Sequence, residues 1–158
     1  MTRRTIAHPQ SVEGVGLHLG VECRLTFQPA PSGQGITFVR ADLAGRPTIR
    51  ATVDTAALTD RRTQIGRDPE SVHTVEHVLA AVGAMGIDDL TVELSGPEPP
   101  IMDGSAAAFT QALAAAGIAQ QPGIVQYWEL AEPVRLEDGD SIYEAYPADA
   151  LELDVTID

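Results

Sequence analysis

The sequence contains no lysine, and its ten basic residues, all arginines, stand against 23 aspartates and glutamates. The net charge of −13 argues against nucleic acid as a partner, because binding to phosphates needs a clustered positive surface. No apolar run reaches the ~20 residues of a membrane-spanning helix, and the first residues are not followed by the apolar core of a signal peptide. We therefore expect a soluble, cytoplasmic protein with no membrane span.

Cysteine is almost absent as well. The single Cys23 excludes an internal disulfide. It lies in an alternating segment over residues 21–27, which places Val21, Cys23, Leu25 and Phe27 on one face of a strand. We expect Cys23 to be a small buried hydrophobic residue of that face.

The sequence does contain enough apolar residues, 44%, for one globular core. Four segments have the composition or alternation of strands: 21–27, 36–39, 49–53 and 90–94. Strands come first in the chain, and a helical segment, a further strand and a second helical segment follow. This order predicts an α+β domain and not a doubly wound one.

Two segments have the apolar spacing of amphipathic helices. For the first, Ser71 is the expected N-cap and Gly86 the residue just past the end, with an apolar stripe of Val75, Val78, Leu79 and Val82. The second is expected to be capped by Asp103 or Ser105 and to end at Gly117, with an apolar stripe of Phe109, Ala112, Leu113 and Ala116.

The composition changes at Gln120-Gln121-Pro122-Gly123, a polar segment that we interpret as a linker. The net charge is −4 up to Gln121 and −9 beyond it. Alternating segments follow over 125–130, 141–146 and 151–157, with a turn at 137–140. So short a region cannot build a core of its own. We expect a complete domain over 1–121 and the first strands of an incomplete second domain over 122–158.

The strongest chemical signal is His73-Thr74-Val75-Glu76-His77. On a helix, the two histidines would lie together, opposite the apolar stripe. A neutral imidazole binds Zn²⁺, and a neighbouring carboxylate can take a proton from metal-bound water. The alternative is a pair of surface histidines beside a helix-favouring glutamate. The spacing alone leaves both interpretations open.

The same five residues match H-x-x-E-H, the signature of inverted zinc metallopeptidases. In those enzymes both histidines bind zinc, the glutamate is the base, and a distant carboxylate completes the site. Glu152 could supply that carboxylate here.

Two further segments carry information. The glycine-rich segment 14–20 lacks the G-x-G-x-x-G spacing of a dinucleotide site, and His18 is its only titratable residue. The segment 96–106 is a proline-stiffened loop that leads into the second helix, where Asp103 is expected to act as a cap.

Taken together, these motifs resemble those of the UDP-3-O-acyl-N-acetylglucosamine deacetylases, zinc enzymes of lipid A synthesis. The likeness runs from about Thr5 to Asp158 and rests on several separate segments in the same order and spacing: 14–18, 74–77, 86–88, 99–106, 134–140 and 153–158. The last two resemble the first strands of a second domain of that family.

The resemblance implies two similar domains, each a two-layer sandwich of a small mixed β-sheet with two helices, with the active site between them. It implies His77 as a zinc ligand, Glu76 as the general base acting on zinc-bound water, and His18 near the substrate. A His and an Asp of the second domain would complete the zinc site, and a lysine, a threonine and a general-acid histidine would come from the same domain. These residues cannot be placed in this sequence, because no histidine follows His77 and the sequence contains no lysine.

The implied reaction is the hydrolysis of the N-acetyl group of UDP-3-O-acyl-N-acetylglucosamine, which releases acetate. A catalytic zinc site normally has three protein ligands, so we expect this chain alone to be inactive. Its partner would be the missing second domain, on the same or a separate chain. The alternatives are a non-catalytic scaffold or interaction domain of the same fold and an inverted zinc metallopeptidase. The peptidase is disfavoured because His73 is not a ligand in the family pattern.

Overall fold

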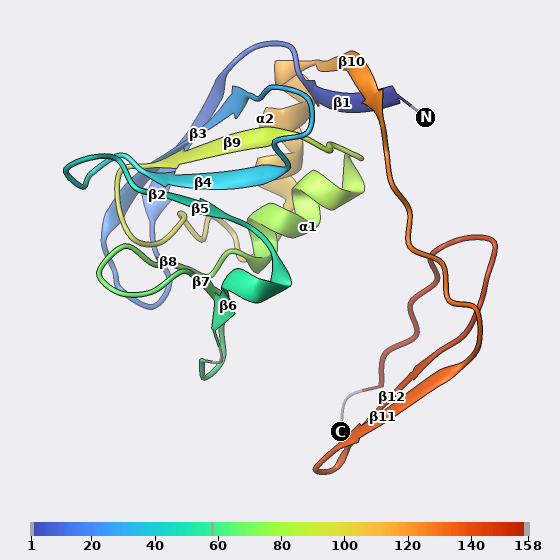
Figure 1. The fold of residues 1–158 in the computed structure, drawn as a ribbon. Helices are drawn as coiled ribbons and strands as arrows, with labels where there is room; N and C mark the ends of the chain where they lie inside the picture. Colours follow the sequence, from blue (N-terminus) through green and yellow to red (C-terminus); the bar gives the residue numbers. More distant parts are fainter. Residues whose placement is uncertain (1, 58, 157–158) are drawn as a thin grey trace. The chain divides into compact units, whose positions relative to one another are not determined.

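The alternating segment around Cys23 forms strand β3 (Glu22–Pro29) in a computed structural model of the chain, which describes residues 2–57 and 59–156. This strand belongs to a five-stranded sheet of order β2-β3-β9-β4-β5 (Figure 1). The other strands are β2 (Gln10–Val15), β4 (Ile36–Arg40), β5 (Thr48–Arg50) and β9 (Leu90–Leu94). Only β4 and β9 pair in parallel, so the sheet is mixed.

Two helices, α1 (Glu76–Ala84) and α2 (Ala107–Ala116), cover one face of this sheet. Strand alternation turns one set of side chains towards the helices, and the rings of Phe27 and Phe109 meet there edge to face, with centroids 6.4 Å apart. The opposite face of β3 and β9 carries Thr26, Gln28, Thr91 and Glu93. The expected α+β fold with two layers is therefore confirmed. The core contains Leu25, Phe38, Leu90, Val92, Leu94, Val78, Ala81, Val82 and Leu113.

A smaller three-stranded sheet lies between β5 and α1 in the sequence: β6 (Ala56–Ala57), β7 (Gln64–Ile65) and β8 (Val72–His73). The strand expected over 49–53 is shorter than predicted and ends at Arg50. The chain continues into a 3₁₀ turn, Val53–Thr55, because the Thr55 hydroxyl accepts a bond from the Thr52 N–H and donates to the Arg50 carbonyl.

The first helix begins later than the sequence indicated. Ser71 does not cap it, because its hydroxyl donates to Asp68 and the chain then enters β8. Thr74 has a left-handed φ of 55°, which interrupts any helix before Val75. At the other end, Gly86 has a φ of 60° and follows the C-cap Met85, as predicted.

The second helix begins at Ala107 and its N-cap is Ala106, so the prediction that Asp103 or Ser105 is the N-cap is wrong. The Ser105 hydroxyl accepts a bond from the Ala107 N–H, and the Asp103 carboxylate accepts bonds from the Ser105 N–H and hydroxyl. Ser105 therefore binds the first N–H of the helix from outside it, and Asp103 holds Ser105 in place. Gly117 has a φ of 68° and ends the helix, as expected.

The expected linker Gln120–Gly123 is wrong, because these residues are part of strand β10 (Ile118–Ile124). This strand pairs with β1 (Thr2–Ile6), and the Pro122 carbonyl accepts a bond from the Ser32 hydroxyl. The described chain divides instead into two compact units, residues 1–125 and 126–158. The assignment of the last residues to a second domain stays a prediction.

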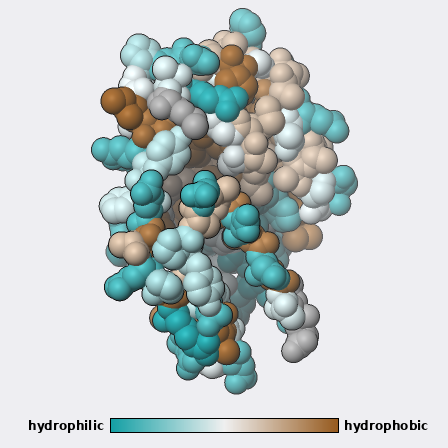
Figure 2. Space-filling view, turned by 90° about the vertical axis from the view of Figure 1, so that its right-hand side faces the viewer, coloured by the Kyte–Doolittle hydropathy of each residue, from teal (hydrophilic) through white to brown (hydrophobic). Residues whose placement is uncertain are grey.

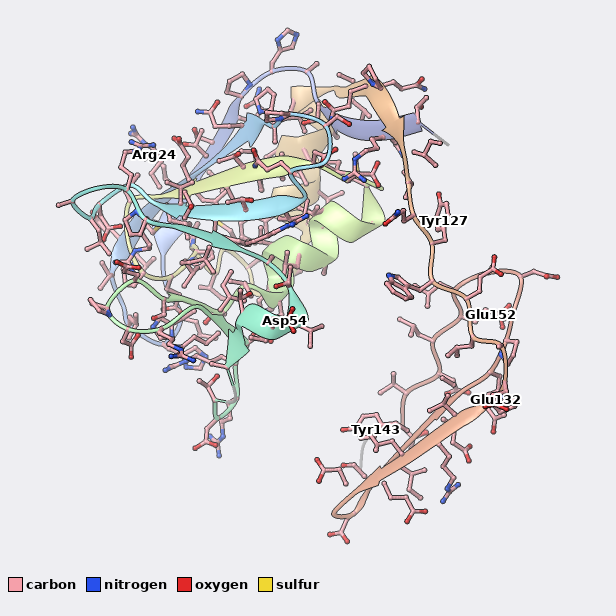
Figure 3. The ribbon with its side chains drawn as sticks, in the orientation of Figure 1. Arg24, Asp54, Tyr127, Glu132, Tyr143 and Glu152 are labelled. Atoms are coloured by element: carbon pink, nitrogen blue, oxygen red, sulfur yellow. The ribbon has the colours of Figure 1, made fainter. Side chains whose placement is uncertain are left out.

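The second unit contains one antiparallel hairpin, β11 (Val134–Asp138) and β12 (Ser141–Ala145). The turn between them has Gly139 at a φ of 59°, as the sequence indicated. The segments 125–130 and 151–156 are not strands, which corrects two expectations; Ile157, where the second expected strand ends, lies outside the described residues. They have no partner strand, and the exposed Trp128 and Leu151 show how little covers them. Figure 3 marks Tyr127, Glu132, Tyr143 and Glu152 in this unit.

The surface is mixed in character. The face shown in Figure 2 has hydrophobic residues interspersed with hydrophilic ones. In the part of the chain that the structure describes, neither helix has the length and apolar character needed to cross a membrane.

Candidate functional site

Glu76 and His77 are the first two residues of α1, and both are half-buried. The Glu76 carboxylate accepts a hydrogen bond of 3.1 Å from the backbone N–H of Thr63, in the loop that precedes β7. A carboxylate in the first turn is also stabilised by the positive end of the helix dipole. The predicted base and the predicted metal ligand are therefore neighbours in the first turn of α1, and one hydrogen bond engages the Glu76 carboxylate.

The segment before α1 is held in an unusual conformation. Thr74 is buried, and a left-handed φ is rare for a β-branched residue. Its hydroxyl donates a hydrogen bond of 2.6 Å to Oε1 of Glu98. This bond anchors the residue that lies two positions before Glu76.

Glu98 is a buried carboxylate that the sequence analysis did not single out. Besides the bond from Thr74, it accepts hydrogen bonds from the backbone N–H groups of His18 (3.1 Å) and Leu19 (2.9 Å). Burial alone would raise the pKa of Glu98, but the bonds from Thr74, Leu19 and His18 outweigh burial and hold that pKa below its ordinary value. Glu98 is therefore an ionised group inside the first unit.

The predicted substrate residue, His18, lies in the turn between β2 and β3, and its side chain is exposed. Its backbone N–H and the Thr74 hydroxyl both donate to Oε1 of Glu98. Glu98 thus links the turn that carries His18 to Thr74, which lies two positions before Glu76.

His73 is not where the sequence predicted it. It is buried on β8, and its backbone N–H donates to the Pro97 carbonyl, so it shares no helix face with His77. Its Nε2 lies 3.2 Å from the Ser71 hydroxyl, and Nδ1 is buried without a partner among the described residues. Burial, followed by the nearby charge of Arg62, lowers the pKa of His73 and favours the neutral ring.

The inverted-peptidase hypothesis fails on this geometry, because it needs both histidines on one helix. The proposed third ligand, Glu152, belongs to the other unit of the chain (Figure 3).

The donors around His77 decide whether a zinc ion fits there. No hydrogen bond or ion pair within residues 2–57 and 59–156 engages the His77 imidazole, which leaves its ring nitrogens available. No group of three or more His, Cys, Asp or Glu side chains in that same part of the chain is arranged to hold a metal ion. His77 thus fits one position of a zinc site that needs further ligands.

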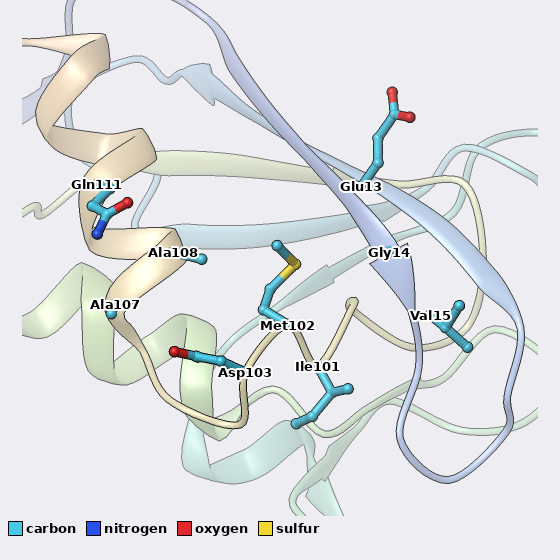
Figure 4. Close-up of a pocket in the computed structure, with 9 residues that line it drawn as sticks. All are labelled: Glu13, Gly14, Val15, Ile101, Met102, Asp103, Ala107, Ala108 and Gln111. Carbon is cyan, nitrogen blue, oxygen red and sulfur yellow. The ribbon is translucent and has the colours of Figure 1, made fainter.

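A pocket of about 540 Å³ lies between β2 and the start of α2 (Figure 4). Glu76, His77 and His18 are not among the residues around it. Bonds from Ser105 hold the pKa of Asp103 at its rim below the ordinary value. The lining residues are Glu13, Gly14, Val15, Ile101, Met102, Asp103, Ala107, Ala108 and Gln111.

The signals that identified these residues differ. Glu76 and His77 were singled out by a motif, and the resemblance to the deacetylase family implied their roles and that of His18. Glu98 lies in the proline-rich loop Gly96–Pro100, where an acid is normally solvated. The one signal in the sequence was the glycine at position 16, because a glycine allows another group to approach the backbone closely. In the structure that group is the Glu98 carboxylate.

Comparisons with known proteins match nearly the whole chain. The family model of LpxC, UDP-3-O-acyl N-acetylglycosamine deacetylase, matches residues 3–158. The UDP-3-O-acyl-N-acetylglucosamine deacetylase of Myxococcus xanthus is 44% identical over 156 residues, which cover 99% of this chain and 50% of the relative. The enzyme of the same name from Bdellovibrio bacteriovorus is 42% identical, with 99% of this chain and 52% of the relative covered.

A third relative, the bifunctional enzyme LpxC/FabZ of Chlorobaculum tepidum, is 41% identical over 158 residues, which are 34% of its length. The chain spans about half the length of the two deacetylases that it matches. With its motifs, its α+β fold and a family match over residues 3–158, this chain belongs to the UDP-3-O-acyl-N-acetylglucosamine deacetylase family.

Proposed function

We propose that this chain supplies the general base and one zinc ligand of a deacetylase that hydrolyses the N-acetyl group of UDP-3-O-acyl-N-acetylglucosamine, in lipid A synthesis. The observation that carries the proposal is the pair Glu76 and His77 at the start of α1, with Glu76 bound by the Thr63 N–H and His77 unengaged. The family match and the names of the relatives agree with this chemistry.

Each residue has a defined task in the reaction. Glu76 takes a proton from the water that attacks the acetamide carbonyl, and the Thr63 N–H keeps its carboxylate aimed. A ring nitrogen of His77 would hold the zinc ion. A zinc ion bound there would supply Lewis-acid activation of the carbonyl and of water. His18, exposed on its turn, contacts the bound substrate.

We further propose that the chain alone is inactive. A catalytic zinc site has three protein ligands, and His77 is a single one. The resemblance assigns the other two, a His and an Asp, to a second domain that would also carry the general acid. The acidic composition of this chain points the same way, because a substrate diphosphate needs cations that a net charge of −13 does not favour.

The test measures acetate release from UDP-3-O-acyl-N-acetylglucosamine by the chain alone and by the chain mixed with the second half of the Myxococcus xanthus relative. The first half of that relative serves as the positive control for the mixture. We expect release only in the mixture and only with zinc. Glu76→Gln and His77→Ala should abolish it, whereas Glu70→Gln, which changes an exposed carboxylate, should not.

Release that survives both site substitutions would overturn the assigned roles. A mixture that assembles but releases no acetate, while the positive control does, would instead favour the non-catalytic scaffold.

A further inference from the structure

The Glu98 carboxylate joins two segments of the first unit that are far apart in the sequence. It accepts bonds from His18 and Leu19 in the turn between β2 and β3, and from Thr74, which precedes α1. Oε1 serves both segments, at 3.1 Å from the His18 nitrogen and 2.6 Å from the Thr74 hydroxyl oxygen. Glu98 therefore links the turn to the segment that leads into α1.

The group is unusual for a structural tie. Glu98 is 1% exposed, and no arginine is paired with it among the described residues. A buried carboxylate is stable only when hydrogen bonds replace its hydration, and here two backbone N–H groups and one hydroxyl do so. Apolar packing would join the two segments without the free-energy cost of burying a charge. A buried carboxylate at this place therefore indicates that the orientation of the two segments matters.

The two joined segments carry the proposed site. Thr74 lies two residues before Glu76, and the bond from its hydroxyl supports a backbone conformation that threonine rarely adopts. The N–H of His18 is bound while its imidazole remains exposed. Fixing the backbone of a turn in this way sets the direction of the Cα–Cβ bond from which the His18 imidazole extends.

We infer that Glu98 is a positioning residue, which holds the exposed imidazole of His18 in register with Glu76 and His77 so that the three act on one bound substrate. This inference rests on the proposed function. Glu98 itself touches neither substrate nor metal and acts through His18 and Thr74.

The first test follows amide hydrogen exchange in the chain without substrate. Glu98→Gln keeps the shape of the side chain but turns an amide N–H₂ towards donors. We expect the His18 and Leu19 amides to exchange at least about ten-fold faster, because bonds to a charged acceptor are the strong ones. The Ala81 and Val82 amides, which lie beyond the first turn of α1, should remain protected.

A second pair of variants tests the same contact in case Glu98→Gln does not fold. Thr74→Val removes one donor without changing size and should also speed exchange at His18, whereas Thr74→Ser keeps the hydroxyl and should restore slow exchange. Unchanged exchange at His18 and Leu19 in both Glu98→Gln and Thr74→Val would overturn the inference.

The second test is a double-mutant cycle on acetate release in the active mixture. If Glu98 acts through His18, Glu98→Gln should lower kcat/KM about ten-fold in the parent chain but much less when His18→Ala is already present. A merely structural tie predicts effects that multiply, and multiplied effects would overturn the inference.

The two tests separate this inference from the proposed function. Amide exchange at His18 and Leu19 can be measured without zinc and without substrate. A mixture without deacetylase activity would therefore count against the proposed function alone, while the exchange result would still decide whether Glu98 holds the turn.

Discussion

Arg3 donates two hydrogen bonds of 2.7 Å to Asp89, one from Nε to Oδ2 and one from Nη2 to Oδ1. The Asp89 side chain has no exposed surface, whereas that of Arg3 keeps 18% exposure. Oδ1 also accepts from the Gly35 N–H and Oδ2 from the Gln121 side chain. One carboxylate thus ties β1, β10 and the segment before β4 to the start of β9.

Asp89→Asn should lower the free energy of unfolding by about 3 kcal/mol, because it leaves Arg3 without its partner and turns an amide N–H₂ towards donors. This loss is at the low end of the range for a broken buried ion pair, because Arg3 is partly exposed to solvent. Urea denaturation measures it. As a matched control, Glu13→Gln breaks the exposed pair with Arg24 and should change stability by less than about 1 kcal/mol. Equal losses in the two variants would contradict the role of Asp89.

Stability should fall in acid because of two carboxyls. Burial alone would raise the pKa of Asp89, but bonds from Arg3 and the Gly35 N–H hold it below its ordinary value, and Glu98 behaves likewise. A carboxyl whose pKa is lowered by folding stabilises the protein above its unfolded pKa, about 4, and loses this contribution as the pH falls through the folded pKa. Urea denaturation between pH 2 and 7 should show unfolding becoming easier below about pH 4. The free energy of unfolding should depend less steeply on pH in Asp89→Asn. An unchanged pH dependence would show that Asp89 is not a source of the acid sensitivity.

The strands that alternate cleanly were predictable from the sequence. Residues 90–94 form β9 because its side chains alternate between the core and the polar face. β2 was missed because it is an edge strand with few apolar residues, of which Val12 packs against the core. The start of α1 was misplaced for a non-local reason, since Val72 pairs with Ile65 and Thr74 bonds to Glu98. Apolar spacing along the helix carries no trace of these contacts.

The candidate site could be predicted only in part. The motif singled out Glu76 and His77, but its spacing left a pair of surface histidines as an alternative, and their roles, which the resemblance implies, stay predictions. His73 was placed wrongly because the motif was read on an unbroken helix. Glu98 was missed because its role depends on donors from two distant segments, which sequence reasoning does not bring together.

Gly16 lies against Glu98 so closely that a Cβ would stand 2.5 Å from Oε2. Gly16→Ala should displace the carboxylate from its donors and destabilise the protein by about 2 kcal/mol. Gly83→Ala is the matched control, because a Cβ there meets no atom within 4 Å. Gly83 lies within α1, so alanine should stabilise the protein by about 0.5–1 kcal/mol. Thermal unfolding should move in opposite directions in the two variants, and a shared direction would contradict the steric argument.

The hairpin of the second unit should be far less protected than the sheet of the first. Every side chain of β11 and β12 is exposed, and the ion pairs of Arg135 with Glu137 and Glu144 are too solvated to contribute much. A hairpin without a covering layer is marginally stable in water. In the 158-residue chain, amides of β11 and β12 should exchange within about ten-fold of the unfolded rate, whereas those of β3 and β9 should be strongly protected. Slow exchange in the hairpin, comparable to that in β9, would mean that other contacts stabilise the second unit.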